Sequence, residues 1–128
     1  MRFMMLYKPG SESDTPPIQR ELEEMGRFIG EMAQAGVLLA TDGLQPSSKG
    51  ARVRISDGKF TVVDGPFTET KELIAGFAIV QAKSKQEAIE LAKRFLTVVG
   101  EGESEIRLMH DTPAFEAGER QTASSVAN

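Results

Sequence analysis

The clearest local signal in the chain is the segment ARVRISDGKFTVV, residues 51–63. Two runs that alternate apolar and polar residues flank an Asp-Gly pair, and a two-residue Asp-Gly loop is typical of a type I′ hairpin turn. In the register that this turn sets, Ile55 faces Phe60 and Val53 faces Val62 on the same side of the ladder. The segment therefore predicts a β-hairpin with one apolar face.

Each side of the hairpin carries a strand, a helix and a second strand. Apolar residues recur at helical spacing between Ile18 and Met32, after Thr15 as a cap, and again after the capping box Ser84-x-x-Glu87. The flanking strands are predicted at residues 2–8, 37–41, 75–82 and 104–109. This order predicts an α+β fold in which two helices cover one face of a five- or six-stranded antiparallel sheet.

Two helices can cover only one face of such a sheet, so the other face is expected to be open. The first strand places either Phe3, Met5 and Tyr7 or Met4 and Leu6 on that open face. An uncovered apolar sheet face normally meets a partner. We therefore predict a homodimer that pairs through the sheet face.

Composition excludes several classes of protein. The chain has 128 residues, no cysteine and one histidine, which leaves no thiolate chemistry and no metal site built from several imidazoles. The net charge is −4 and no basic cluster is present, so we expect no direct nucleic-acid partner. No apolar run reaches the length of a membrane span, which predicts a cytoplasmic protein with no membrane partner. We expect no metal and no cofactor.

Domain organisation follows from the loss of periodicity near the C-terminus. Residues 1–115 are predicted to form one domain. Residues 116–128 are rich in Glu, Ala, Ser, Thr and Gly, a composition that cannot bury enough apolar surface to offset the entropy of ordering. We expect this segment to be a flexible tail.

The segment VDGPFTETKE, residues 63–72, closely resembles the signature of the DGPF branch of the YCII-related proteins. The resemblance runs from Arg2 to about Met109 and includes AGVL at 35–38 and DGLQP at 42–46. It implies a ferredoxin-like fold that pairs as a dimeric α/β barrel. Within the broader group a histidine on the first helix is a possible acid–base residue. Residues 18–35 contain no histidine, so that role cannot be carried over.

Two aspartates are the best candidates for proton transfer. Asp64 follows the hairpin on the same side as its apolar face, and Asp42 follows the second strand. A carboxylate beside an apolar surface is partly desolvated, as a general base needs to be. The alternative for each is a turn residue that hydrogen-bonds its own backbone, before Gly43 for Asp42 and near Pro66 for Asp64.

Five other residues are candidates for ligand binding. Phe67 can stack on a ligand or fill the core, and Glu69 and Lys71 can belong to a charged site, to the dimer seam or to a solvated surface. Arg54 and Arg107 can clamp an anion, and a cross-strand ion pair is the alternative for Arg107.

These features predict a protein that binds a small organic molecule in a pocket at the barrel mouth, with acid–base chemistry of the lyase or isomerase type. A binding module with the same pocket and no turnover is one alternative. Because proteins of this resemblance are often encoded near sigma-factor genes, a regulatory interaction protein is another.

Overall fold

The computed structural model describes residues 1–12, 17–69 and 72–111. Its strands are β1 (Arg2–Lys8), β2 (Leu38–Gly43), β3 (Ala51–Ser56), β4 (Lys59–Asp64), β5 (Gly76–Gln81) and β6 (Glu103–Leu108). Its helices are α1 (Gln19–Gln34), α2 (Lys85–Val99) and a short 3₁₀ turn, η1 (Ser47–Lys49). The predicted tail, residues 116–128, and the predicted cap, Thr15, lie outside the described residues.

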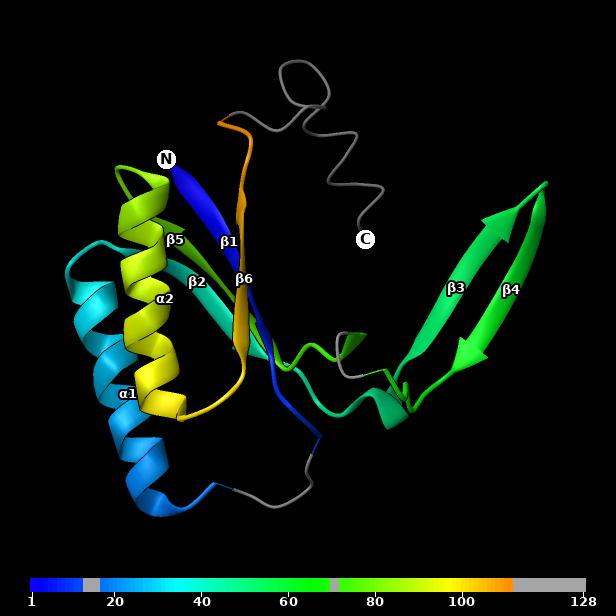
Figure 1. The fold of residues 1–128 in the computed structure, drawn as a ribbon, viewed down its shortest axis with the longest axis horizontal. Coiled ribbons are helices and arrows are strands. Elements are labelled where there is room, and N and C mark those ends of the chain that lie inside the picture. The colour runs from blue at the N-terminus through cyan, green and yellow to red at the C-terminus, as the bar shows by residue number, and fades with distance from the viewer. Residues whose placement is uncertain (13–16, 70–71, 112–128) are drawn as a thin grey trace.

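The main sheet has the strand order β2-β5-β1-β6, and every neighbouring pair in it is antiparallel. The two long helices lie side by side on one face of this sheet (Figure 1). Two strand–helix–strand units in this order are the ferredoxin-like arrangement. The predicted fold class, α+β with two helices on one face, is confirmed.

The expectation of a five- or six-stranded sheet is wrong for the described part of the chain. Strands β3 and β4 pair with each other in a separate two-stranded sheet. Figure 1 shows this hairpin extending away from the main sheet and the helices. Alternation of apolar and polar residues predicts a strand and its faces, but it contains no information about which sheet the strand joins.

The predicted turn and register of the hairpin are confirmed. Asp57 and Gly58 have φ angles of 51° and 75°, the positive values that a type I′ turn requires. Ile55 pairs with Phe60 and Val53 with Val62. The second helix begins as predicted, because the Ser84 hydroxyl accepts a hydrogen bond of 3.1 Å from the amide of Glu87.

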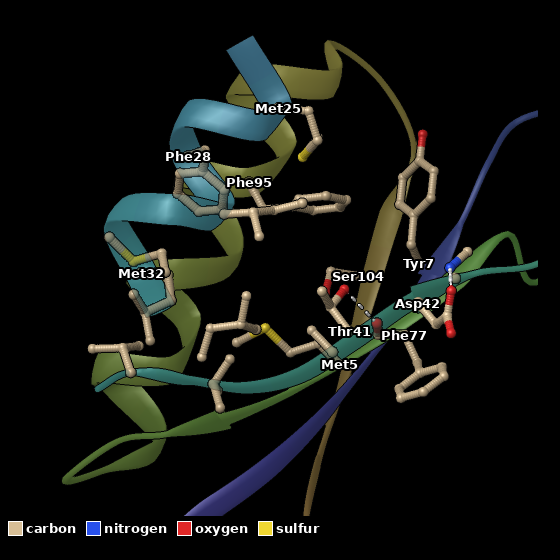
Figure 2. Close-up of a pocket in the computed structure, with 18 of the residues that line it drawn as sticks. Met5, Tyr7, Met25, Phe28, Met32, Thr41, Asp42, Phe77, Phe95 and Ser104 are labelled. Carbon is tan, nitrogen blue, oxygen red and sulfur yellow. Dashed lines mark hydrogen bonds between the residues drawn. The ribbon is translucent and has the colours of Figure 1, made fainter. Parts of the chain in front are cut away.

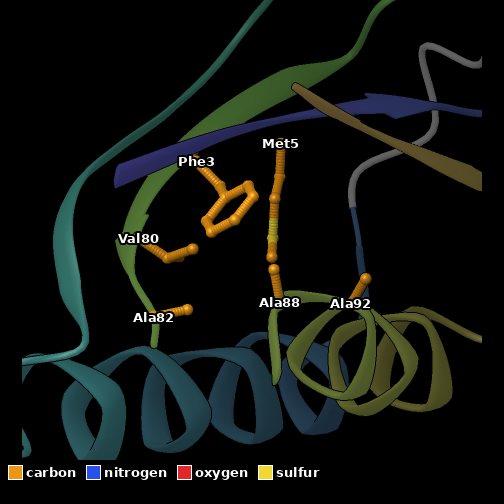
Figure 3. Packing of buried hydrophobic residues seen from close by; sticks show 6 residues of the cluster. All are labelled: Phe3, Met5, Val80, Ala82, Ala88 and Ala92. Carbon is orange, nitrogen blue, oxygen red and sulfur yellow. The ribbon is translucent and has the colours of Figure 1, made fainter. Parts of the chain in front are cut away.

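The core lies between the sheet and α2. It consists of buried apolar residues from β1, the end of β5 and one face of α2, namely Phe3, Met5, Val80, Ala82, Ala88 and Ala92 (Figure 3). The alanines have short side chains, which allow α2 to approach the sheet closely. Since Phe3 and Met5 face the helices, Met4 and Leu6 occupy the open face of the sheet.

Candidate functional site

A cavity of about 520 Å³ lies between the helices and the sheet (Figure 2). This volume is in the range of small-molecule binding sites, which is roughly 300–1,000 Å³. The predicted pocket was at the mouth of a dimeric barrel. The cavity lies instead within one chain, on the helix-covered face of the sheet.

The walls of the cavity are mainly apolar. Long side chains reach into it from both helices, including Met25, Phe28, Met32, Leu91 and Phe95. The sheet contributes Met5, Leu38 and Val80 together with the small residues Gly76 and Ala78. Because these small residues leave space beneath the helical side chains, the same layer that forms the core also encloses a cavity.

Three residues with hydroxyl groups contribute to the lining. Ser104 is paired in register with Tyr7 on the neighbouring strand, and Thr41 lies on β2, which β5 separates from β1. The Thr41 hydroxyl donates a hydrogen bond of 2.9 Å to the carbonyl of Phe77. A ligand with polar groups could therefore be oriented by these hydroxyls while its apolar part contacts the remaining walls.

Tyr7 is held in place from two sides. Its ring meets the ring of Phe95 edge to face at 5.3 Å, and its hydroxyl donates a hydrogen bond of 2.9 Å to the carbonyl of Glu101. Burial raises the pKa of the Tyr7 phenol above its usual value, and the negative charge of Glu101 raises it further. Tyr7 is therefore a neutral phenol at physiological pH.

Asp42 is the predicted catalytic residue that lies at the cavity. It pairs in register with Phe77, and its Oδ1 accepts a hydrogen bond of 3.0 Å from the amide of Gly43. In Figure 2 the side chains of Asp42 and Phe77 point away from the helices. The carboxylate thus takes part in a local turn at the edge of the cavity.

The sequence profile of the YCII-related domain matches residues 1–110. The chain belongs to the YCII-related family. An uncharacterised protein of Rhizobium meliloti (strain 1021) is 34% identical over 83 residues, which are 65% of this chain and 64% of that protein. The match therefore spans less than two thirds of the relative's length.

One solved structure is similar to this YCII-related chain at 14% identity and a TM-score of 0.44, over 86% of this chain and 94% of the other. It is the 5-chloro-2-hydroxyhydroquinone dehydrochlorinase of Burkholderia phenoliruptrix AC1100 in complex with 2,5-dihydroxybenzoquinone.

The predicted residues of the signature segment lie at the foot of the hairpin. Asp64 is exposed and pairs with Ala51, on the hairpin face that also carries Phe60 and Val62, as the predicted register requires. It is not among the residues that line the cavity. Glu69 is exposed, and Lys71 lies outside the described residues.

Phe67 packs beneath a cation. The guanidinium of Arg52 lies 3.7 Å from the centre of the Phe67 ring and makes an ion pair of 2.8 Å with Glu72. The Phe67 amide donates a hydrogen bond of 2.9 Å to the hydroxyl of Ser47. Both contacts connect the signature segment to neighbouring parts of the same chain.

The two predicted anion-binding arginines lie apart from the cavity. Arg54 is exposed on the hairpin opposite Thr61. Arg107 pairs at 3.1 Å with Glu105, which also binds Lys8 at 2.6 Å on the adjacent strand. Hydrogen bonds from Lys8 and then from Arg107 hold the pKa of Glu105 below its usual value. The structure therefore does not bring the predicted ligand-binding set together.

Sequence reasoning missed a polar cluster around Ser47. The amide and the hydroxyl of Ser47 donate hydrogen bonds of 2.6 and 2.7 Å to the two carboxylate oxygens of Glu12. The same hydroxyl accepts from the Phe67 amide, so the cluster joins three segments that are distant in the sequence. No local pattern marks Glu12 or Ser47, because their partners are set by the tertiary fold.

The described residues contain neither a cluster of metal ligands nor a membrane-spanning helix. No group of three or more His, Asp or Glu side chains in the described part of the chain is arranged to hold a metal ion. Among the same residues, no helix is long and apolar enough to cross a membrane.

Proposed function

We propose that this YCII-related protein binds a small organic molecule in the cavity between its helices and its sheet. The observation that supports the proposal is the cavity of about 520 Å³ with apolar walls and the hydroxyls of Tyr7, Thr41 and Ser104 in its lining. Two aromatic rings, Phe28 and Phe95, suit contact with an unsaturated ring. The favoured ligand is therefore a compact aromatic molecule with one or two hydrogen-bonding substituents.

The acid–base part of the proposal rests on Asp42 at the edge of the cavity. Because its side chain points away from the helices with Phe77, the proposal requires a substrate that reaches this edge of the sheet. A lyase- or isomerase-type reaction needs a proton acceptor within reach of the ligand. Asp42→Asn keeps the shape of the side chain and removes its basicity. We expect this variant to bind ligand as the wild type does and to lose about 100-fold in turnover of any substrate found.

The test of binding uses phenol and benzoate as probes and two tryptophan variants of α2. Leu91 lines the cavity and its neighbour Glu90 is exposed. Leu91→Trp places a larger ring in the cavity and is expected to weaken ligand binding there, whereas Glu90→Trp leaves the cavity unchanged. A ligand at 100 times its Kd stabilises the native state by roughly 2.7 kcal/mol, which corresponds to a rise in Tm of several degrees.

We expect such a rise for the wild type and for Glu90→Trp, each measured against its own ligand-free Tm. Leu91→Trp should show a smaller rise at the same ligand concentration, because the larger ring takes up part of the cavity. An equal rise in all three proteins would place the binding site outside the cavity. No rise in any protein with either probe would count against small aromatic ligands.

We also propose that the chain forms a homodimer through the open face of its sheet. Met4 and Leu6 on β1 pair with Ile79 and Phe77 on β5, so four apolar side chains are contiguous on that face. The charged residues Lys8, Glu105 and Arg107 lie beside them. An apolar centre with a charged rim is the usual anatomy of a protein interface.

A further inference from the structure

The hairpin β3–β4 carries an exposed apolar face. Val53, Ile55, Phe60 and Val62 share this face, and each exposes between 60% and 72% of its surface. Together they expose on the order of 500 Å², which is the size of an interaction patch on a soluble protein. The four residues are called the arm face below.

The foot of the hairpin is braced so that the arm face stays exposed. Arg52 lies on the opposite side of the hairpin, where it packs on Phe67 and pairs with Glu72. The amide of Gly65 also donates a hydrogen bond of 3.0 Å to the carbonyl of Gly50. These contacts lie at the foot of the hairpin and leave the arm face free. Figure 1 shows the hairpin directed away from the main sheet of the same chain.

The same chain presents a second apolar surface. The open sheet face is formed by Met4, Leu6, Phe77 and Ile79, and the arm face lies on a hairpin that projects away from the main sheet (Figure 1). A strand of six residues is about 20 Å long, and four strands spaced by 4.8 Å are about 19 Å across. The arm is thus long enough to cross the whole sheet of another molecule.

We propose that the arm face of each chain docks on the open sheet face of a second copy, and that the second copy returns the contact. This proposal rests on the homodimer proposed above and adds the element that closes it. In a two-fold dimer, each arm face covers the open sheet face of the other chain, so a single arrangement covers both surfaces of both chains. An unrelated partner would need one contact for the arm face and another for the sheet face. The arm face supplies the larger share of the contact area, because Met4, Leu6, Phe77 and Ile79 are half-buried. Together with the charged residues beside them, Lys8, Glu105 and Arg107, the two faces approach the roughly 800 Å² per chain that a stable interface buries.

The test compares two neighbouring residues on β4. Phe60 belongs to the arm face, and Thr61 is exposed on the opposite face of the same strand. Sedimentation velocity is measured at roughly 10–100 μM, where a dimer with a micromolar Kd forms. We expect dimers for the wild type and for Thr61→Asp. Phe60→Asp buries an unpaired charge and should weaken the dimer at least about 100-fold, giving monomers.

A Leu6→Asp variant distinguishes the docking of the arm from the formation of the homodimer, because Leu6 lies on the open sheet face and not on the arm. If Leu6→Asp is monomeric and Phe60→Asp dimerises like the wild type, the homodimer stands and the docking of the arm is refuted. If the wild type itself is monomeric, both proposals fail and the arm face belongs to another partner. Circular dichroism confirms that each variant is folded.

Position 60 also permits a test that does not depend on disrupting the dimer. A photo-crosslinking benzoylphenylalanine placed there should join the arm to strands β1 and β5 of the second copy, mapped by mass spectrometry on mixed light and heavy chains. Crosslinks from arm to arm, or only within one chain, would overturn the proposal.

Discussion

Strand β1 in the main sheet and strand β4 in the hairpin each place a phenylalanine on a face that carries other apolar side chains, yet the two phenylalanines have opposite surroundings. Phe3 exposes 2% of its surface and Phe60 exposes 72%. Phe3 lies beneath α2, whose Ala88 and Ala92 allow the helix to pack closely. Alternation therefore predicts which side chains share a face, and the neighbouring elements decide whether that face is covered.

The largest expected difference between the two regions is in stability. Phe3→Ala leaves a void in the core and should lower the free energy of unfolding by about 3–5 kcal/mol. Chemical denaturation of this variant should show the loss at every protein concentration. Phe60→Ala, the same substitution on the arm, removes within its own chain only the cross-strand contact with Ile55, which is worth roughly 0.2–1 kcal/mol.

Phe60→Ala should therefore lower the free energy of unfolding mainly at concentrations where the dimer forms, and on dilution its effect should fall to roughly 1 kcal/mol or less. A loss of 3 kcal/mol or more at high dilution, on the order of a core truncation, would mean that the arm packs within its own chain. The contrast between the main sheet and the hairpin would then be wrong.

Much of the fold was predictable because its signals are local. The positive φ angles of Asp57 and Gly58 and the cap at Ser84 depend on residues close in sequence, and all were predicted. The placement of the hairpin outside the main sheet was not, because pairing between strands is a property of the whole chain. The same limit explains why Glu12 and Ser47 were missed.

The candidate site was less predictable than the fold. The cavity depends on small residues such as Gly76 and Ala78 lying opposite long helical side chains from distant segments. Most of the candidates predicted from the sequence lie instead in or near the signature segment. Its described residues Phe67 and Glu72 contact Arg52 at the foot of the hairpin. Of the predicted catalytic pair, Asp42 lines the cavity and Asp64 lies on the hairpin.

The pKa of a tyrosine side chain gives a smaller difference between the main sheet and the hairpin. The chain has one tyrosine, so absorbance at alkaline pH reports Tyr7 alone. We expect its pKa to lie above the usual value of 10.0, and Glu101→Gln to lower it part of the way back. Because the folded pKa is raised, the stability linked to Tyr7 is present below pH 10 and is lost as the pH rises through the folded value.

A second tyrosine introduced by Thr61→Tyr on the exposed side of the arm provides the control. It should titrate near the ordinary pKa of about 10, well separated from Tyr7. A single titration step near 10 for both residues would show that Tyr7 is as solvated as the arm.

Methionine methyl NMR tests the central claim, binding in the cavity, most directly. Met5, Met25 and Met32 line the cavity. Met4 lies next to Met5 on strand β1 but on the opposite, open face of the sheet. On titration with phenol, the account predicts chemical-shift changes at the methyls of these three residues and none at Met4. Changes at Met4 with Met5, Met25 and Met32 unmoved would contradict it.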